Sequence, residues 1–381
     1  MTMTSALLTL EKANRKIEDR FESKLEVNFD LSRKLVSFQA NKKEPGYRWF
    51  KFKEGYSSGL VNYVMLKLHI DKSETLDPFA GSGTTLFGAS LRGLDSVGIE
   101  LLPIATEIIE VRKLIASMDK IQLREILKKW SDEKPWELET SPIKFPHLNI
   151  TRGAFPDETE KMIGLYLNAI KRKKNKELRR VLQFPLLCIL EEISFTRKDG
   201  QYLRWDFRSG RVGGKKKFNK GVIKTFDAAI TQKLQEIYQD IEPQNLFNGK
   251  IVSHRGNVKV LGGSCLSILP KMRTSQFSFI MTSPPYCNRY DYTRTYALEL
   301  ALLGVNNESI KELRQTMITC TVENREKPEL KSLFNAREYY YAGEAFDSQK
   351  ELRTIFLILF FLFFQFHGFF LSHLRRRELL L

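Results

Sequence analysis

Two short segments carry residues whose types and spacing are suited to chemistry. The first is DPFAGSGTT, Asp77 to Thr85, and the second is TSPPY, Thr282 to Tyr286. Gly81 and Gly83 lack side chains, so the backbone there can approach a ligand closely, and a helix behind them would supply N–H donors. In TSPPY the two prolines end a strand and fix the backbone, which leaves a serine oxygen and an aromatic ring at a rigid corner.

The elements around the glycine loop predict a nucleotide-binding unit. A strand is expected at Glu74 to Leu76, a helix from Leu86 to Arg92, and a second strand from Ser96 to Glu100. In such units an acid at the end of the second strand binds ribose hydroxyls. The loop has no lysine, which disfavours a P-loop ATPase. The ligand is NAD or S-adenosylmethionine, and the single GxG favours the second; a glycine-rich turn that serves packing alone is the structural alternative.

Three further elements position the second segment. SSGLVNYVMLKLHI, 57–70, predicts a helix with Ser57 or Ser58 as its N-cap. Strands are expected at VKVLGG, 258–263, and at FSFIM, 277–281. TSPPY then lies at the carboxyl end of a strand, where open α/β sheets bind their ligands. Helical patterns dominate residues 105–250, between the two α/β parts of the chain.

Composition restricts the class of partner and the compartment. The chain has 381 residues and a formal net charge of +16. That charge implies a polyanion, most simply nucleic acid, with an acidic membrane surface as the alternative. The four cysteines form no CxxC pair, which argues against a metal site and a disulfide framework. The N-terminus does not have the pattern of a signal peptide, so we expect a protein of the reducing cytoplasm.

Two basic clusters are the best candidates for contacts with nucleic acid. The first is KRKKNKELRR, 171–180, for which a solvated helix face is an equal alternative. The second, 204–220, has aromatic residues and glycines among its basic residues and is typical of a loop in a target-recognition insert. The DNA-contacting residues predicted in it are Arg204, Arg208, Arg211, Lys215, Lys216 and Lys217.

The two motifs together resemble the amino-methyltransferases of DNA. These enzymes transfer a methyl group from S-adenosylmethionine to N4 of cytosine or N6 of adenine. The resemblance implies a Rossmann-like parallel sheet methyltransferase core of the α/β class, with a mainly helical, basic insert. It implies cofactor-binding roles for Asp77, Pro78, Phe79, Gly81, Gly83, Thr84, Glu100 and Ser264, and catalytic roles for Ser283, Pro284, Pro285 and Tyr286. Ser264 stands where the family has an acid that contacts the adenine part of the cofactor.

The chemistry explains why the family needs these residue types. The lone pair of an exocyclic amine is delocalised into the base, and acceptors against its N–H bonds return electron density to the nitrogen. Ser283 Oγ and the Pro284 carbonyl are such acceptors, and Tyr286 offers a face for a base flipped out of the duplex. SPPY favours N4 of cytosine. The alternatives are N6 of adenine, methylation of RNA or protein amino groups, and a DNA-binding relic without catalysis.

These observations divide the chain into five segments. We expect a helical extension over 1–48, the cofactor-binding half of the core over 49–110, a helical and basic insert for target recognition over 111–250, the catalytic half with SPPY over 251–345, and an aberrant apolar tail over 346–381. DNA is the expected partner, and a paired restriction endonuclease is a second partner that the sequence leaves open.

The tail differs in composition from the rest of the chain. IFLILFFLFFQFHGFFL, Ile355 to Leu371, has 17 residues and is nearly all apolar, whereas a spanning helix needs about 20. A membrane anchor and a buried helix are two interpretations, and the membrane is the less favoured partner. The third is a reading-frame shift that replaced the true C-terminus. Because the later strands of the family are missing, we hypothesise a truncated methyltransferase that lacks the C-terminal part of its core.

Overall fold

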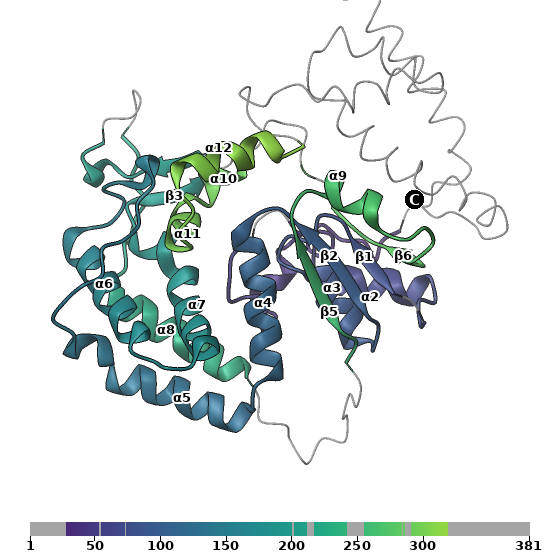
Figure 1. Cartoon of the computed structure of the whole chain (residues 1–381), viewed down its shortest axis with the longest axis horizontal. Coiled ribbons are helices and arrows are strands. Elements are labelled where there is room, and N and C mark those ends of the chain that lie inside the picture. Colours follow the sequence, from purple (N-terminus) through teal and green to yellow (C-terminus); the bar gives the residue numbers. More distant parts are fainter. Residues whose placement is uncertain are drawn as a thin grey trace, which may run out of the picture.

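The computed structural model places a parallel β-sheet beside a larger layer of helices, with helix α4 (Pro103–Ser117) between them (Figure 1). The structure describes residues 28–52, 55–72, 74–199, 202–211, 217–241, 255–283, 285 and 291–318. The apolar tail over 346–381 lies outside these residues. Within them, no helix is both long enough and apolar enough to cross a membrane.

The sheet has four parallel strands in the order β5–β2–β1–β6. They are β1 (Thr75–Asp77), β2 (Ser96–Glu100), β5 (Val258–Gly262) and β6 (Phe279–Ile280). The first three strands of the chain run outward from β1 in one direction, and β6 then returns to the other side of β1. The order therefore reverses between β1 and β6, and this is the switch point at which doubly wound sheets bind ligands.

Both faces of the sheet are covered. Helices α2 (Ser58–Lys67) and α3 (Thr84–Leu91) lie with α4 on one face, and α9 (Cys265–Ile268) with η6 (Leu269–Lys271) covers the other. Gly98 allows α3 to approach closely, because a Cβ atom there would lie 2.7 Å from Leu86. Val97 and Ile99 point to the opposite face and pack with Cys265. Burial on both faces is what a parallel sheet requires.

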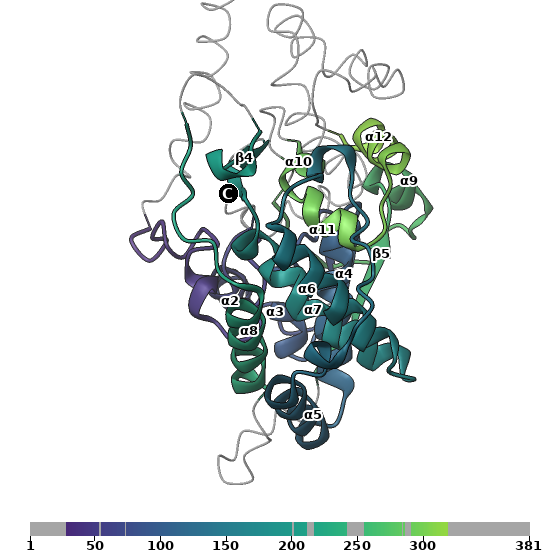
Figure 2. The same ribbon diagram turned by 90° about the vertical axis from the view of Figure 1, so that its left-hand side faces the viewer.

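The helical layer is built from segments before and after β6. It contains α5 (Lys120–Glu133), α6 (Asp157–Lys171), α7 (Lys176–Ile193), α8 (Phe226–Asp240), α10 (Tyr292–Thr295), α11 (Ala297–Leu302), α12 (Asn307–Thr316), the hairpin of β3 (Thr196–Asp199) and β4 (Tyr202–Trp205), and the 3-10 turns η3 (Pro135–Leu138), η4 (Asn149–Thr151) and η5 (Phe207–Ser209). The 3-10 turn η2 (Ala40–Lys43) instead contacts α2. The core of the helical layer includes Trp136 and Tyr166, whose rings lie 5.1 Å apart. Figure 2 shows β4, α10, α12 and α9 at the same end of the molecule, the end where the sheet strands finish.

Most local expectations for the core are confirmed. Helix α2 begins after Ser57, whose side chain accepts a hydrogen bond from the Leu60 N–H. Strand β2 has the expected bounds. The strand expected over 277–281 is wrong in length, because β6 pairs only at Phe279 and Ile280. After Ile280 the Met281 N–H still donates to the Leu76 carbonyl at 3.2 Å, so the chain stays beside β1 up to TSPPY. The division into five segments stays a prediction.

An N-terminal strap, residues 46–52, connects the helical layer to the glycine loop. The buried Asp240 carboxylate on α8 accepts hydrogen bonds from the Gly46 N–H at 3.1 Å, Arg48 Nε at 3.0 Å and Trp49 Nε1 at 2.8 Å. At the other end of the strap the Phe52 ring stacks on Tyr296 at 5.4 Å. The strap therefore fixes Phe52 between the two layers.

Candidate functional site

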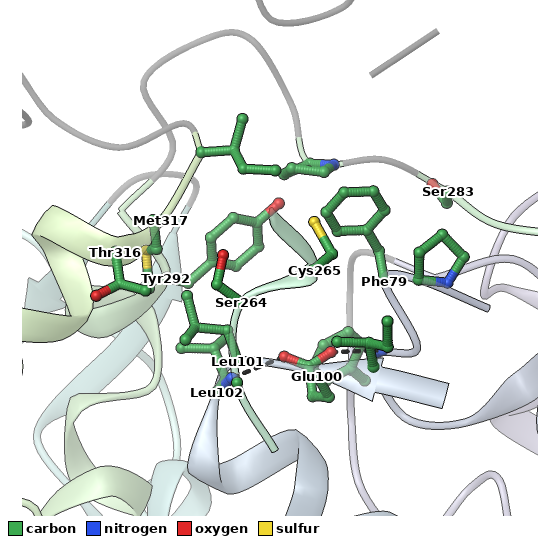
Figure 3. Close-up of a pocket in the computed structure, with 17 residues that line it drawn as sticks. Phe79, Glu100, Leu101, Leu102, Ser264, Cys265, Ser283, Tyr292, Thr316 and Met317 are labelled. Atoms are coloured by element: carbon green, nitrogen blue, oxygen red, sulfur yellow. Dashed lines mark hydrogen bonds between the residues drawn. The ribbon is translucent and has the colours of Figure 1, made fainter. Parts of the chain in front are cut away.

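A cavity opens at the carboxyl ends of the strands, where the loops that follow all four of them converge (Figure 3). It encloses about 710 Å³ of atom-free space, including its open mouth. The lining residues are Phe52, Pro78, Phe79, Gly81, Ile99, Glu100, Leu101, Leu102, Gly263, Ser264, Cys265, Ser283, Pro285, Tyr292, Thr316, Met317 and Ile318.

The glycine loop places only part of its predicted residues in this cavity. Pro78, Phe79 and Gly81 line it. Gly81 has a φ of +52°, and a Cβ atom there would lie 3.0 Å from the Phe52 ring. Only glycine satisfies that combination without strain.

The other three predicted residues of the loop are not among the lining residues. Gly83 has a φ of +80° and is the N-cap of α3, where a Cβ atom would lie 2.9 Å from Ile109. Thr84 is the buried first residue of that helix. Asp77 is 2% exposed and its carboxylate is bonded to other protein groups. The roles of these three residues in cofactor binding stay predictions.

Glu100 occupies the floor of the cavity. Its Oε2 accepts a hydrogen bond from the Gly81 N–H at 2.7 Å, and its Oε1 accepts one from the Leu102 N–H at 2.8 Å (Figure 3). Burial raises the pKa of this carboxyl to about 7, although the two backbone N–H groups oppose the rise. Each oxygen retains a second lone pair, so the ionised carboxylate can accept further hydrogen bonds from hydroxyl groups of a ligand.

The loop after β5 forms the wall next to Glu100. The Gly263 N–H donates to the Glu100 carbonyl at 2.9 Å, which holds this loop against β2. Ser264 and Cys265 follow and line the cavity. Burial raises the pKa of the Cys265 thiol to about 12, so it is a neutral, unreactive group at ordinary pH. Of the three residues of this loop that line the cavity, Ser264 is therefore the one that carries a hydroxyl group.

Ser283 and Pro285 of the SPPY motif also line the cavity. Figure 3 shows Ser283 on the same side as Phe79, away from Tyr292 and Met317. Pro284 and Tyr286 lie outside the described residues, so their predicted roles remain sequence-based. The structure therefore brings the serine of SPPY to the cavity that the glycine loop and Glu100 form, although about two hundred residues separate the two motifs.

The helical layer supplies the opposite wall. Tyr292 comes from α10; the sequence after SPPY predicts it at the pocket mouth or in contact with DNA, with a solvated loop as the alternative. Thr316 ends α12, Met317 follows it, and Phe52 comes from the strap, and the sequence did not indicate these three. The one available signal is the aromatic composition of the strap, which has two phenylalanines, a tryptophan and a tyrosine.

The predicted DNA-contacting arginines lie apart from this cavity lining and are held by other protein groups. Arg204 pairs with Asp199 at 3.0 Å. Arg208 forms two hydrogen bonds to the buried Asp206, and these hold the pKa of that carboxyl well below its usual range. Arg211 donates to the Arg152 carbonyl at 2.6 Å.

The lysines of the second basic cluster and the residues of the first basic cluster have different surroundings. Lys217 is exposed, and Lys215 and Lys216 lie outside the described residues. The first basic cluster spans the turn between α6 and α7. There Arg172 pairs with Glu139 and Arg180 pairs with Glu107 of α4. Part of its charge is therefore neutralised within the protein.

A four-stranded parallel sheet with this strand order, glycine loop and terminal acid defines a Rossmann-like methyltransferase core. Among the described residues, no group of three or more histidine, cysteine, aspartate or glutamate side chains is arranged to hold a metal ion.

Comparison with known proteins gives the family. The Type II methyltransferase M.AvaI of Nostoc sp. is 48% identical over 322 residues, which are 84% of this chain and 66% of the relative; M.AvaI of Anabaena variabilis gives the same values. The Type II methyltransferase M.BsoBI of Geobacillus stearothermophilus is 40% identical over 342 residues, 86% of this chain and 65% of the relative. No protein-family model and no solved structure matches the chain. The chain belongs to the family of these Type II methyltransferases and spans slightly less than two thirds of their length.

Proposed function

We propose that the protein methylates DNA, moving a methyl group from S-adenosylmethionine to the exocyclic N4 of cytosine in a flipped-out base. The observation that carries the proposal is the convergence of Phe79, Glu100, Ser264 and Ser283 on one cavity at the switch point of the sheet. Identity of 40–48% to Type II methyltransferases supports the reaction class.

The residues present fit the cofactor. Glu100 offers carboxylate oxygens for ribose hydroxyls, and Ile99, Leu101 and Leu102 form an apolar wall next to it for a flat adenine ring. The methionine part would lie against the glycine loop at Gly81, where a Cβ atom would crowd the Phe52 ring of the cavity wall. When bound, S-adenosylmethionine supplies an activated methyl group on a sulfonium. The Ser264 hydroxyl is a weaker partner for the adenine part than the acid usual at this position.

At the methyl acceptor, the residues of this chain would orient the exocyclic amine and accept hydrogen bonds from its two N–H groups. Ser283 Oγ would accept one N–H, and the Pro284 carbonyl would accept the other. Tyr286 would hold the plane of the base. The N–H group of the amine becomes acidic only as the nitrogen forms its bond to the methyl group. Positioning and electrostatics therefore matter more than a strong base.

The choice of N4 of cytosine rests on the serine of SPPY, because DPPY and NPPY are commoner among N6-adenine enzymes. An aspartate or asparagine would offer a different acceptor at the same corner. We propose DNA as the partner, a paired restriction endonuclease as the biological context, and the cytoplasm as the place of action. The end at which Figure 2 shows β4, α10 and α9 would face the duplex.

The experiment is to sequence modified bases in DNA from cells that express the full chain. N4-methylcytosine at one recurring sequence is the expected result, and N6-methyladenine would select the alternative base. A Ser283→Ala variant should lose most of the modification while it keeps its affinity for S-adenosylmethionine. Absence of any methylated base, together with intact cofactor and DNA binding by the purified wild type, would refute catalysis and support the DNA-binding relic.

A further inference from the structure

A buried hydrogen-bond network joins the glycine loop to the segment that leads into SPPY. It lies at the switch point, where β1 and β6 are neighbours. Asp77 Oδ1 accepts a hydrogen bond from the Thr282 hydroxyl at 2.7 Å and another from the Phe79 N–H at 3.1 Å. Asp77 is 2% exposed, so water does not compete for these bonds. One carboxylate oxygen therefore connects both loops of the site.

Two hydroxyl groups close the network from the helical face of the sheet. The Tyr56 hydroxyl donates to the other oxygen of the Asp77 carboxylate at 3.3 Å. The Thr85 hydroxyl has one proton, which it shares between the Tyr56 oxygen and the Met281 carbonyl, 3.2 Å away. Thr85 is fully buried. The two residues that directly precede Ser283 are thus fixed, one through its carbonyl and one through its side chain.

The surroundings of Asp77 indicate a role in holding other protein groups in place and not in contacting a ligand. Its neighbours Pro78, Phe79 and Gly81 line the cavity, and Asp77 is not among the lining residues. Both of its oxygens are engaged by protein donors. A buried carboxylate with such partners sets the relative place of the groups that donate to it.

We propose that Asp77 is a positioning residue that sets the place of Ser283 relative to the glycine loop through Thr282, and that it is not a ligand of the cofactor. This inference rests on the proposed function, because the two loops then carry the two reactants. In-line transfer requires reacting atoms about 3–3.5 Å apart, and a displacement of about 1 Å costs roughly a hundredfold in rate. A hydrogen bond that ties the loops together is therefore expected to act on kcat.

Four variants of the full chain test the proposal. Thr282→Val removes the hydroxyl at nearly constant volume, and Thr282→Ser keeps it. Asp77→Asn removes the charge but keeps an oxygen that can accept from Thr282. Thr151→Val is the control for loss of a threonine hydroxyl away from the site: Thr151 is fully buried, Thr282 is half-buried, and the Thr151 hydroxyl donates to the Leu148 carbonyl in the helical layer.

Each variant is measured for the Kd of S-adenosylmethionine, for kcat with tritiated cofactor on unmethylated genomic DNA, and for hydrogen exchange of residues 281–283. Thr282→Val should lower kcat about tenfold to a hundredfold, with a cofactor Kd within about twofold of wild type, and should speed exchange of residues 281–283. Thr282→Ser keeps the hydroxyl and should have the kcat and the exchange rate of the wild type. Asp77→Asn should leave the cofactor Kd within about twofold, and Thr151→Val should leave kcat and exchange in residues 281–283 unchanged.

Two results would overturn the proposal. One is an increase of more than about tenfold in the cofactor Kd of Asp77→Asn, which would make the charge a cofactor ligand. The other is exchange in residues 281–283 that does not change in Thr282→Val. If the wild type binds cofactor but transfers no methyl group, the proposed function fails by itself. The Kd and exchange measurements then still decide whether Asp77 connects the two loops.

Discussion

The carboxylate of Glu100 and the backbone N–H of Gly81 are joined by a hydrogen bond of 2.7 Å across the floor of the cavity. The same carboxylate holds the Leu102 N–H at 2.8 Å with its other oxygen. One side chain therefore sets the glycine loop, its own strand end and the start of α4 relative to one another. It also leaves lone pairs toward the cavity, so structural support and ligand binding are combined in one group.

Glu100→Gln should weaken cofactor binding. An amide presents one oxygen and one NH₂ group, so either the Gly81 or the Leu102 N–H would face another donor. Loss of one charge-assisted hydrogen bond costs about 1.5–3 kcal/mol, which corresponds to an increase in the Kd for S-adenosylmethionine of roughly tenfold to a hundredfold. Isothermal titration measures it. Glu125→Gln, a change at an exposed glutamate of α5, is the control and should bind as wild type does; equal Kd values for both variants would contradict the role of Glu100.

Cofactor binding should also depend on pH. Burial raises the pKa of Glu100 to about 7 in the free protein, and hydroxyl donors of the cofactor would favour the ionised form and lower that pKa in the complex. Affinity should therefore be full above about pH 7 and fall as the pH drops below it, by up to about tenfold per pH unit. Titrations at about pH 6 and pH 8 test this, and the dependence should disappear in Glu100→Gln.

The raised pKa of Glu100 has the opposite effect on the stability of the fold, which decreases as the pH rises. The folded-state pKa values of Glu100 and Asp77 are raised, to about 7 and about 6, above their values in an unfolded chain. The contribution of these two groups to stability is thus fully present below about pH 4, and it is lost as the pH rises from there to about 6 to 7. Bound cofactor should offset that loss at Glu100, and thermal unfolding with and without cofactor measures the difference.

The Gly81→Ala variant should distinguish the effect of backbone strain on stability from an effect on cofactor binding. An alanine at a φ of +52° is strained by about 1–2 kcal/mol, and its Cβ would lie 3.0 Å from the Phe52 ring at the cavity wall. Gly210→Ala is the matched control, because Gly210 has a φ of +70° and nothing within 4 Å of the added carbon. Both variants should lose stability to a similar extent. Only Gly81→Ala should raise the cofactor Kd, and a similar rise in both would mean that strain alone is responsible.

The part of the site that the sequence could predict is the part built from local signals. The glycine loop, the end of β2 and the Ser57 cap of α2 are each specified within about thirty residues of chain. Periodicity and turn chemistry act over that range, and they give the element and the residue that follows it. Resemblance to a known family joined the glycine loop to SPPY, which periodicity alone does not do.

The parts that local signals could not predict depend on contacts between distant segments. Thr282 meets Asp77, and Arg48 meets Asp240, across about two hundred residues each. The arginines of the second basic cluster were predicted from charge and from the aromatic residues and glycines between them, but these signals do not reveal that Asp206 binds Arg208. A buried aspartate has the same letter in the sequence as an exposed one, so only the fold distinguishes them.

Two basic residues of the second cluster should behave differently on mutation. Arg208 is bonded to the buried Asp206 and to the Gly221 carbonyl at 2.7 Å, so Arg208→Ala should lower the unfolding temperature as well as DNA affinity. Lys217 is exposed. Lys217→Ala should leave stability unchanged and reduce the salt dependence of DNA binding by about one unit of slope. Fluorescence anisotropy at several salt concentrations measures this, and an unchanged slope would remove Lys217 from the interface.

A buried ion pair in the helical layer provides the last prediction. Lys198 Nζ lies 2.5 Å from Glu299 Oε1, with side chains only 4% and 1% exposed, and 4.7 Å from the centres of the Phe50 and Tyr296 rings. Lys198→Met alone leaves the Glu299 carboxyl buried without its cation. Glu299→Leu alone leaves the ammonium without its carboxylate. Each should cost about 3–5 kcal/mol in the free energy of unfolding.

The double variant Lys198→Met/Glu299→Leu should be much more stable than either single variant, because no charge then remains desolvated without its partner. Urea unfolding of the four proteins gives the coupling energy between the two positions. If the losses of the single variants simply add in the double variant, each side chain contributes by packing alone. Recovery in the double variant would show that the pair is maintained by mutual neutralisation, next to the Tyr296 ring on which Phe52 of the cavity wall stacks.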